Sequence, residues 1–136
     1  MKLEALKLKA LSFAVIAVAV FVTPALSQTY RFLDYDMGQV TEMKGTVQRL
    51  DWMNPNSELH ILVTNSTTGQ PEEWTLVMGP PSRSTESGWT KDSVKPGDLV
   101  TLKMHPSRDG SHSGQLVSAT LPDGRTLQAT EPNPAG

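Results

Sequence analysis

Cysteine is absent from this chain of 136 residues, and its absence excludes several kinds of chemistry. Disulfide bonds, thiol nucleophiles, thiolate zinc sites and iron–sulfur clusters all require cysteine. The sequence also lacks the glycine-rich loops that bind nucleotides and the His-Glu-x-x-His motif of zinc hydrolases. Its three histidines are far apart, and none has the apolar setting that would support a catalytic triad. We therefore expect a protein that is not an enzyme and that uses no cofactor.

Long hydrophobic runs are almost absent as well. The longest apolar run extends from Leu11 to Val22, well short of the roughly 20 residues that a membrane-spanning helix needs. Lysines precede this run and the small residues Ala25-Leu26-Ser27 follow it, which is the layout of a secretory signal. We expect residues 1–27 to be a cleaved signal peptide, the protein to be periplasmic or secreted, and no membrane span to remain after cleavage. A retained anchor is the alternative.

Positive charge is scarce in the rest of the chain. Residues 28–136 contain 9 Lys and Arg against 13 Asp and Glu, which gives a net charge of −4. Domains that bind nucleic acids are usually basic, so this balance argues against a nucleic-acid partner. We expect the partner to be a small molecule or a protein of the cell envelope.

Glycine and proline, by contrast, are abundant in residues 28–136. They account for 19 of these residues, about 17%, against an average of roughly 12%, so turns are frequent. Between the turns, apolar residues recur at every second position, as in strands with one buried face. This pattern predicts an all-β fold with strands over about residues 39–52, 59–64, 73–78, 100–105 and 115–121, and a short extension ending near residue 129. One helix of one or two turns is expected within residues 82–93.

The order of these elements predicts a small closed barrel. The first strand changes face after Gly45, which indicates a bulge or a sharp bend. A bent strand followed by two strands, a short helix and two more strands matches a five- or six-stranded closed barrel of the OB type. Val100, Leu102 and Met104 are expected to face its interior. The expected organisation is an N-terminal arm at residues 28–37, a barrel domain at residues 38–129, and a flexible tail at residues 130–136 that has nothing apolar to bury.

Aromatic and amide side chains gather at the turn after the first strand. Rigid scaffolds usually display their contacts on such loops, and OB-type barrels bind ligands on the outer face of their second and third strands. We therefore expect a binding or interaction module whose ligand contacts are Trp52, Asn54, Asn56, His60, Thr64 and Trp89. Trp52 and Trp89 have a second interpretation, because each could instead plug an end of the barrel.

Metal binding is an alternative function, because methionine sulfur and imidazole nitrogen suit monovalent copper. Three methionines fall on inward strand positions, where they would fill the core. The candidates that remain for weak copper or zinc binding are His60, His105, His112, Met37 and Met53. Their spacing predicts no dedicated metal site. A third possibility is a structural component of the envelope that protects against stress.

Several short motifs follow one another along the chain: Gly45-Thr46-Val47, Trp52-Met53-Asn54-Pro55, Trp74, Gly88-Trp89, Lys95-Pro96-Gly97-Asp98, Asp109-Gly110-Ser111 and Asp123-Gly124-Arg125. In this order they resemble a family of small bacterial exported proteins of unknown function whose members carry a Trp-x-Asn-Pro-His motif. The resemblance extends over about residues 38–127 and implies a periplasmic location and a small β-barrel, without a known activity. This chain has Asn56 where the family has His, and Gln28-Thr29-Tyr30-Arg31-Phe32 where members often have a His pair. The resemblance therefore implies that any metal site formed by those histidines is lost here.

Overall fold

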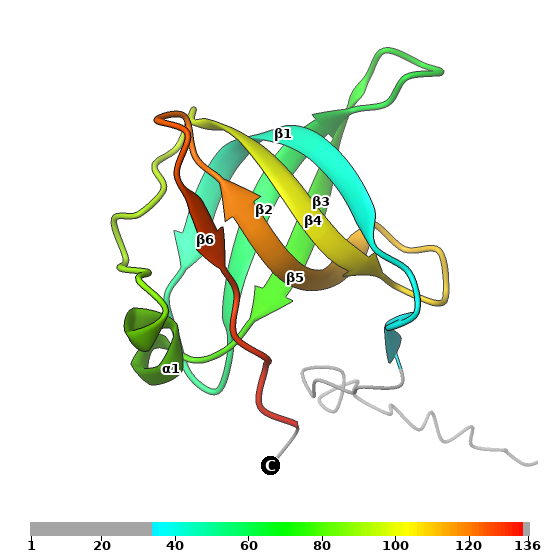
Figure 1. The fold of residues 1–136 in the computed structure, drawn as a ribbon. Helices are drawn as coiled ribbons and strands as arrows, with labels where there is room; N and C mark the ends of the chain where they lie inside the picture. Colours follow the sequence, from blue (N-terminus) through cyan, green and yellow to red (C-terminus); the bar gives the residue numbers. More distant parts are fainter. Residues whose placement is uncertain (1–33, 135–136) are drawn as a thin grey trace, which may run out of the picture.

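Six strands and one short helix form within residues 34–134, the part of the chain that this computed structural model describes (Figure 1). In chain order they are β1 (Thr41–Asp51), β2 (Ser57–Thr64), β3 (Pro71–Met78), α1 (Pro81–Glu86), β4 (Leu99–Pro106), β5 (Ser113–Thr120) and β6 (Thr126–Gln128). The expected signal peptide and the first residues of the expected arm lie outside the described residues. Between residues 34 and 134, no helix has the length and apolar character needed to cross a membrane.

Five of the strands close into a barrel. Neighbouring strands pair in the order β3-β2-β1-β4-β5-β6, and a parallel pairing between β3 and β5 joins the two sides of this sheet. This seam is short, because it includes only residues 75–77 of β3 and residues 113–115 of β5. β6 pairs with the C-terminal half of β5 as an additional strand. The predicted closed barrel, with an extra strand and a short helix between the third and fourth strands, is confirmed.

β1 bends so that its two halves pair with different neighbours. Residues 41–46 pair with β4, and residues 46–51 pair with β2. The register against β2 shifts between Val47 and Arg49, so the change of face occurs at the bulged residue Gln48 rather than directly after Gly45. At Gly45 itself, a Cβ atom would lie only 2.8 Å from the backbone oxygen of Leu62. Glycine at this position therefore permits the close approach of β1 and β2.

Alternate side chains of the strands fill the barrel interior. Val100, Leu102 and Met104 are each at most 3% exposed, which confirms the predicted inward face of β4. Trp89, shortly after α1, is completely buried in the same core, and its indole N–H donates a 3.0 Å hydrogen bond to the backbone oxygen of Gln128. The remaining core residues are Val47, Leu59, Ile61, Leu76, Met78, Val94, Leu116, Ala119, Leu121 and Leu127.

Residues 130–134, called the C-terminal strap below, lie against the barrel. The backbone N–H of Gly79, directly after β3, donates a 2.9 Å hydrogen bond to the backbone oxygen of Thr130. Pro132 is less than 2% exposed. A Cβ atom at Gly79 would collide with the Thr130 hydroxyl and lie 2.8 Å from the backbone oxygen of Glu131. The expectation that this tail has nothing apolar to bury is therefore wrong, because Pro132 is buried and Thr130 has a backbone partner at the end of β3.

Candidate functional site

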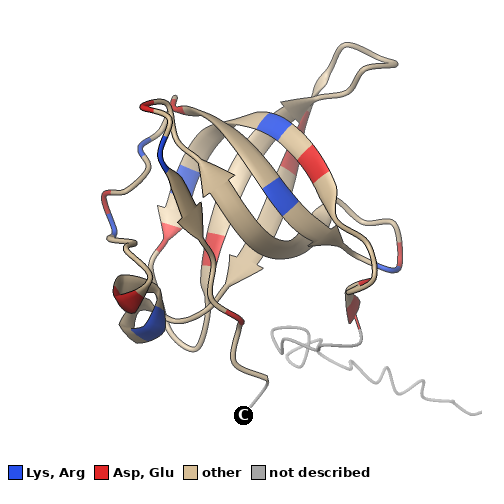
Figure 2. Cartoon of the chain, in the orientation of Figure 1, with Lys and Arg blue, Asp and Glu red and all other residues tan. Residues whose placement is uncertain are grey.

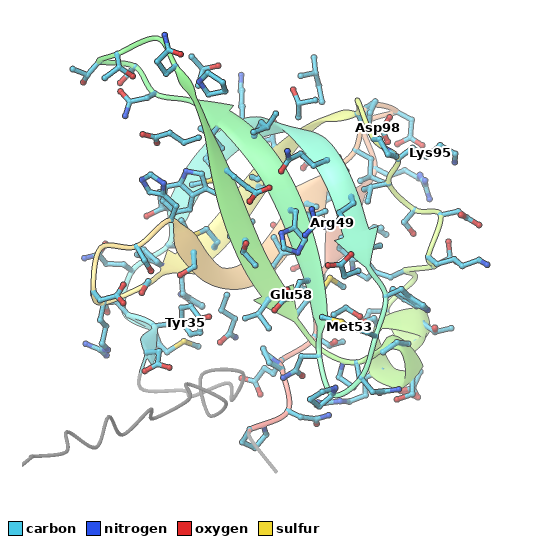
Figure 3. The ribbon with its side chains drawn as sticks, turned by 180° about the vertical axis from the view of Figure 1, so that it is seen from behind. Tyr35, Arg49, Met53, Glu58, Lys95 and Asp98 are labelled. Carbon is cyan, nitrogen blue, oxygen red and sulfur yellow. The ribbon has the colours of Figure 1, made fainter. Side chains whose placement is uncertain are left out.

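Three ionisable side chains, Asp51, Glu58 and His60, meet on the outer face of the barrel and are called the His60 cluster below. The strand register brings them together, because Asp51 of β1 pairs with Glu58 of β2, and His60 follows Glu58 by two residues on the same face. On the other side, His60 pairs with Thr75 of β3. Figure 3 shows Glu58 and the neighbouring Arg49 on this part of the barrel.

The imidazole of His60 lies between two carboxylates. Its Nε2 atom is 3.0 Å from Oδ2 of Asp51 and 3.3 Å from Oε1 of Glu58. These three atoms all lie within 4.8 Å of one another. The other ring nitrogen, Nδ1, lies 3.2 Å from the hydroxyl oxygen of Thr75. The ring is thus held by a hydrogen bond on one side and directs its second nitrogen at two acidic groups.

His60 is buried although it points away from the barrel interior. Only 6% of the residue is exposed. Its Nε2 atom makes no hydrogen bond, although carboxylate oxygens of Asp51 and Glu58 lie 3.0 and 3.3 Å away. Leaving a buried polar atom unsatisfied costs roughly 1–3 kcal/mol. A positive charge between the ring and the carboxylates would remove this cost.

The charge around the His60 cluster is negative, in a molecule whose basic residues are otherwise interspersed with acidic ones (Figure 2). The basic side chain paired with this cluster is Arg49, whose Nε atom lies 3.2 Å from Oδ1 of Asp51 and whose side chain is 54% exposed. An ion pair this exposed contributes little to stability. Burial, together with neighbouring carboxylates that include Glu58, raises the pKa of nearby Tyr35 to about 12. The site therefore favours a cation over an anion.

Asn56, expected as a ligand contact, is instead occupied by the chain itself. It is 7% exposed. Its side-chain amide donates a 3.0 Å hydrogen bond to the backbone oxygen of Asn133 and accepts a 2.6 Å hydrogen bond from the backbone N–H of the same residue. Asn56 thus fastens the C-terminal strap to the turn between β1 and β2, which corrects its expected role.

The other expected contacts do not converge on one cleft either. Trp89 is fully buried, so its role as a ligand platform is corrected to that of a core residue, and Trp52 is half-buried and packs against the same core. Asn54 is exposed in the β1–β2 turn, whereas Thr64 is exposed at the opposite end of β2. About eight extended residues separate these two ends, roughly 25 Å, which is too far for one small ligand. His60 is the one expected contact that belongs to the cluster.

The residues considered for copper or zinc binding are also separated. Nδ1 of His105 is 2.6 Å from a backbone oxygen just before β1, and the ring of His112 stacks on Trp74 with centroids 4.9 Å apart. Neither histidine is part of the His60 cluster. Met37 lines a shallow groove beside β5 together with His105, and Met53 is 40% exposed in the β1–β2 turn.

Sequence reasoning missed Asp51 and Glu58. The signal for them in the sequence is weak. Glu58 and His60 lie two residues apart on one strand, so they share a face, and Asp51 lies at the end of the preceding strand. These positions predict a cluster only when the register of β1 against β2 is known. The bulge at Gln48 sets that register, and the sequence does not reveal which residue is bulged.

A comparison with known proteins identifies one family. The family of unknown function DUF6152 matches residues 16–117, which include β1 to β4 and the whole His60 cluster. No curated protein and no solved structure matches the chain.

Proposed function

We propose that this chain, which belongs to the DUF6152 family of unknown function, is an exported, non-enzymatic binding module whose ligand is a small cation held at the His60 cluster. The charged and then apolar pattern of residues 1–27 supports export. The absence of cysteine and of nucleotide and zinc-hydrolase motifs supports a binding role without catalysis.

One observation carries the proposal. The buried Nε2 atom of His60 has no hydrogen bond and faces carboxylate oxygens of Asp51 and Glu58 at 3.0 and 3.3 Å. When Nε2 carries a lone pair, it and the two carboxylate oxygens repel one another until a positive charge lies between them. The outer face of the second and third strands is also the surface on which OB-type barrels bind ligands.

The test is a nuclear magnetic resonance titration of the ¹⁵N-labelled chain with zinc chloride, magnesium chloride, spermidine and arginine amide, each added separately. We expect at least one of these cations to shift the backbone amides of residues 49–51, 58–60 and 75. Glu58→Gln should reduce that shift. A matched control is His112→Gln, because His112 also lies near a carboxylate, 3.6 Å from Oε1 of Glu72, but outside the cluster. If none of the four cations shifts the amides of the His60 cluster, the proposed function is wrong.

A further inference from the structure

We propose that the cation of the His60 cluster is a divalent transition-metal ion such as zinc, bound by Oδ2 of Asp51, Oε1 of Glu58 and Nε2 of His60. This inference rests on the proposed function and specifies the class of its ligand. Three ligands from the protein would leave a coordination position for water or for a group from a partner.

The spacing of the three atoms fits a metal ion better than an organic cation. Zinc bonds to nitrogen and oxygen are about 2.0–2.1 Å long, so two ligands at a tetrahedral angle stand about 3.3 Å apart. The Nε2 atom of His60 lies 3.0 and 3.3 Å from its two carboxylate neighbours. An ammonium group with hydrogen bonds of about 2.8 Å would hold its acceptors about 4.6 Å apart. An organic cation would therefore have to move both carboxylates away from Nε2, whereas the two distances from Nε2 already suit a zinc ion.

The hydrogen bond on the far side of the ring prepares Nε2 to act as a ligand. When Nδ1 of His60 donates its proton to the hydroxyl oxygen of Thr75, at 3.2 Å, Nε2 carries the lone pair. Metal-binding histidines usually have such a partner on their other nitrogen, because it fixes both the tautomer and the ring orientation. The buried Nε2 atom has no hydrogen bond that a metal ion would need to displace.

The chemistry of the donor set narrows the choice of metal. Calcium and magnesium prefer sites made of oxygen alone, whereas imidazole suits zinc and related transition metals. Monovalent copper prefers sulfur, whereas the three ligand atoms of the cluster are one imidazole nitrogen and two carboxylate oxygens. Zinc is therefore the appropriate probe, and magnesium is the matched negative probe.

Arg49 competes with the metal ion for Asp51. Its Nε atom is 3.2 Å from Oδ1 of Asp51, while Oδ2 of the same carboxylate faces His60. A fixed positive charge this close reduces the attraction of the carboxylate for a second cation. We therefore expect Arg49→Gln to tighten zinc binding several-fold, which is the opposite of the effect of removing a ligand.

The test is calorimetric titration of the untagged full chain with zinc chloride, after a chelator has removed bound metals. We expect one zinc ion to bind per chain, with magnesium giving no measurable heat. Asp51→Asn and Glu58→Gln should each weaken zinc binding by at least about tenfold, and Thr75→Val by about tenfold through the loss of the ring's orienting partner. The control His112→Gln should leave zinc affinity unchanged.

Two readouts separate a lost ligand from a damaged fold. Because His60 is buried, the test uses the more exposed Asp51 and Glu58, and circular dichroism must show that each variant melts at a temperature close to that of the unmodified chain. In the unmodified chain, zinc should shift the imidazole nitrogen resonances of His60 and leave those of His105 and His112 in place.

The metal inference is overturned if zinc does not bind, or if the folded carboxylate variants bind it as tightly as the unmodified chain. If zinc does not bind while spermidine or arginine amide shifts the amides of the His60 cluster, the metal inference is wrong and the proposed function stands. If no cation binds there, both are wrong.

Discussion

Removing the side-chain amide of Asn56 should destabilise the barrel by releasing the C-terminal strap. The amide makes two hydrogen bonds to the backbone of Asn133, at 3.0 and 2.6 Å, from a position that is 7% exposed. Each hydrogen bond of this kind contributes about 1 kcal/mol net, so Asn56→Ala should cost about 2 kcal/mol. For a domain of this size, the melting temperature should fall by about 10 °C.

Urea denaturation followed by tryptophan fluorescence measures this cost. Asn54→Ala, at an exposed position in the same turn, is the control and should change the free energy of unfolding by less than about 0.5 kcal/mol. A chain that ends at Ala129 lacks the strap, so Asn56→Ala should cost little in that background. The reasoning is refuted if Asn56→Ala is as stable as the unmodified full chain, or if it costs as much without the strap as with it.

Two further predictions follow from the core and from the arm before β1. Trp89→Phe keeps most of the buried volume but leaves the backbone oxygen of Gln128 without the N–H donor that now lies 3.0 Å away. The free energy of unfolding, measured by urea denaturation, should therefore fall by about 1–3 kcal/mol. Unchanged stability would contradict this role of Trp89. The pKa of Tyr35 is raised to about 12 from 10.0, so its contribution to stability is present below pH 10 and is lost as the pH rises toward 12. The unmodified chain should therefore lose stability over this range relative to Tyr35→Phe, and parallel pH profiles of the two proteins would show that burial of the phenol has no such effect.

Local patterns were sufficient to predict the strands and the fold class. The alternation of apolar and polar residues was enough to identify Val100, Leu102 and Met104 as inward-facing. Each strand of the barrel buries one face, regardless of which strand lies beside it. A short helix was expected within residues 82–93, and it forms at Pro81–Glu86, so the element was predicted but its bounds were not.

The candidate site depends on contacts that no local pattern encodes. The alternation of apolar and polar residues along β2 correctly placed His60 on the outer face. The burial of His60, however, depends on side chains from the neighbouring strands β1 and β3. Asn56 and Asn133 are 77 positions apart, and nothing in either segment indicates that they pair. The tail was expected to be flexible because its composition is polar, whereas its single buried proline is recognisable only when the barrel surface is known.

The unequal pairing of the strands determines where the closed barrel would open first. β2 and β3 pair along their full lengths, whereas β3 and β5 pair only over residues 75–77 and 113–115. Fewer hydrogen bonds must break to separate β3 from β5, so brief openings should begin there and expose its amides to hydrogen–deuterium exchange before those of β2. The bond from Gly79 to Thr130 lies next to this weak junction. The strap should therefore limit how often this junction opens, and its amides should exchange faster in a chain that ends at Ala129 than in the full chain.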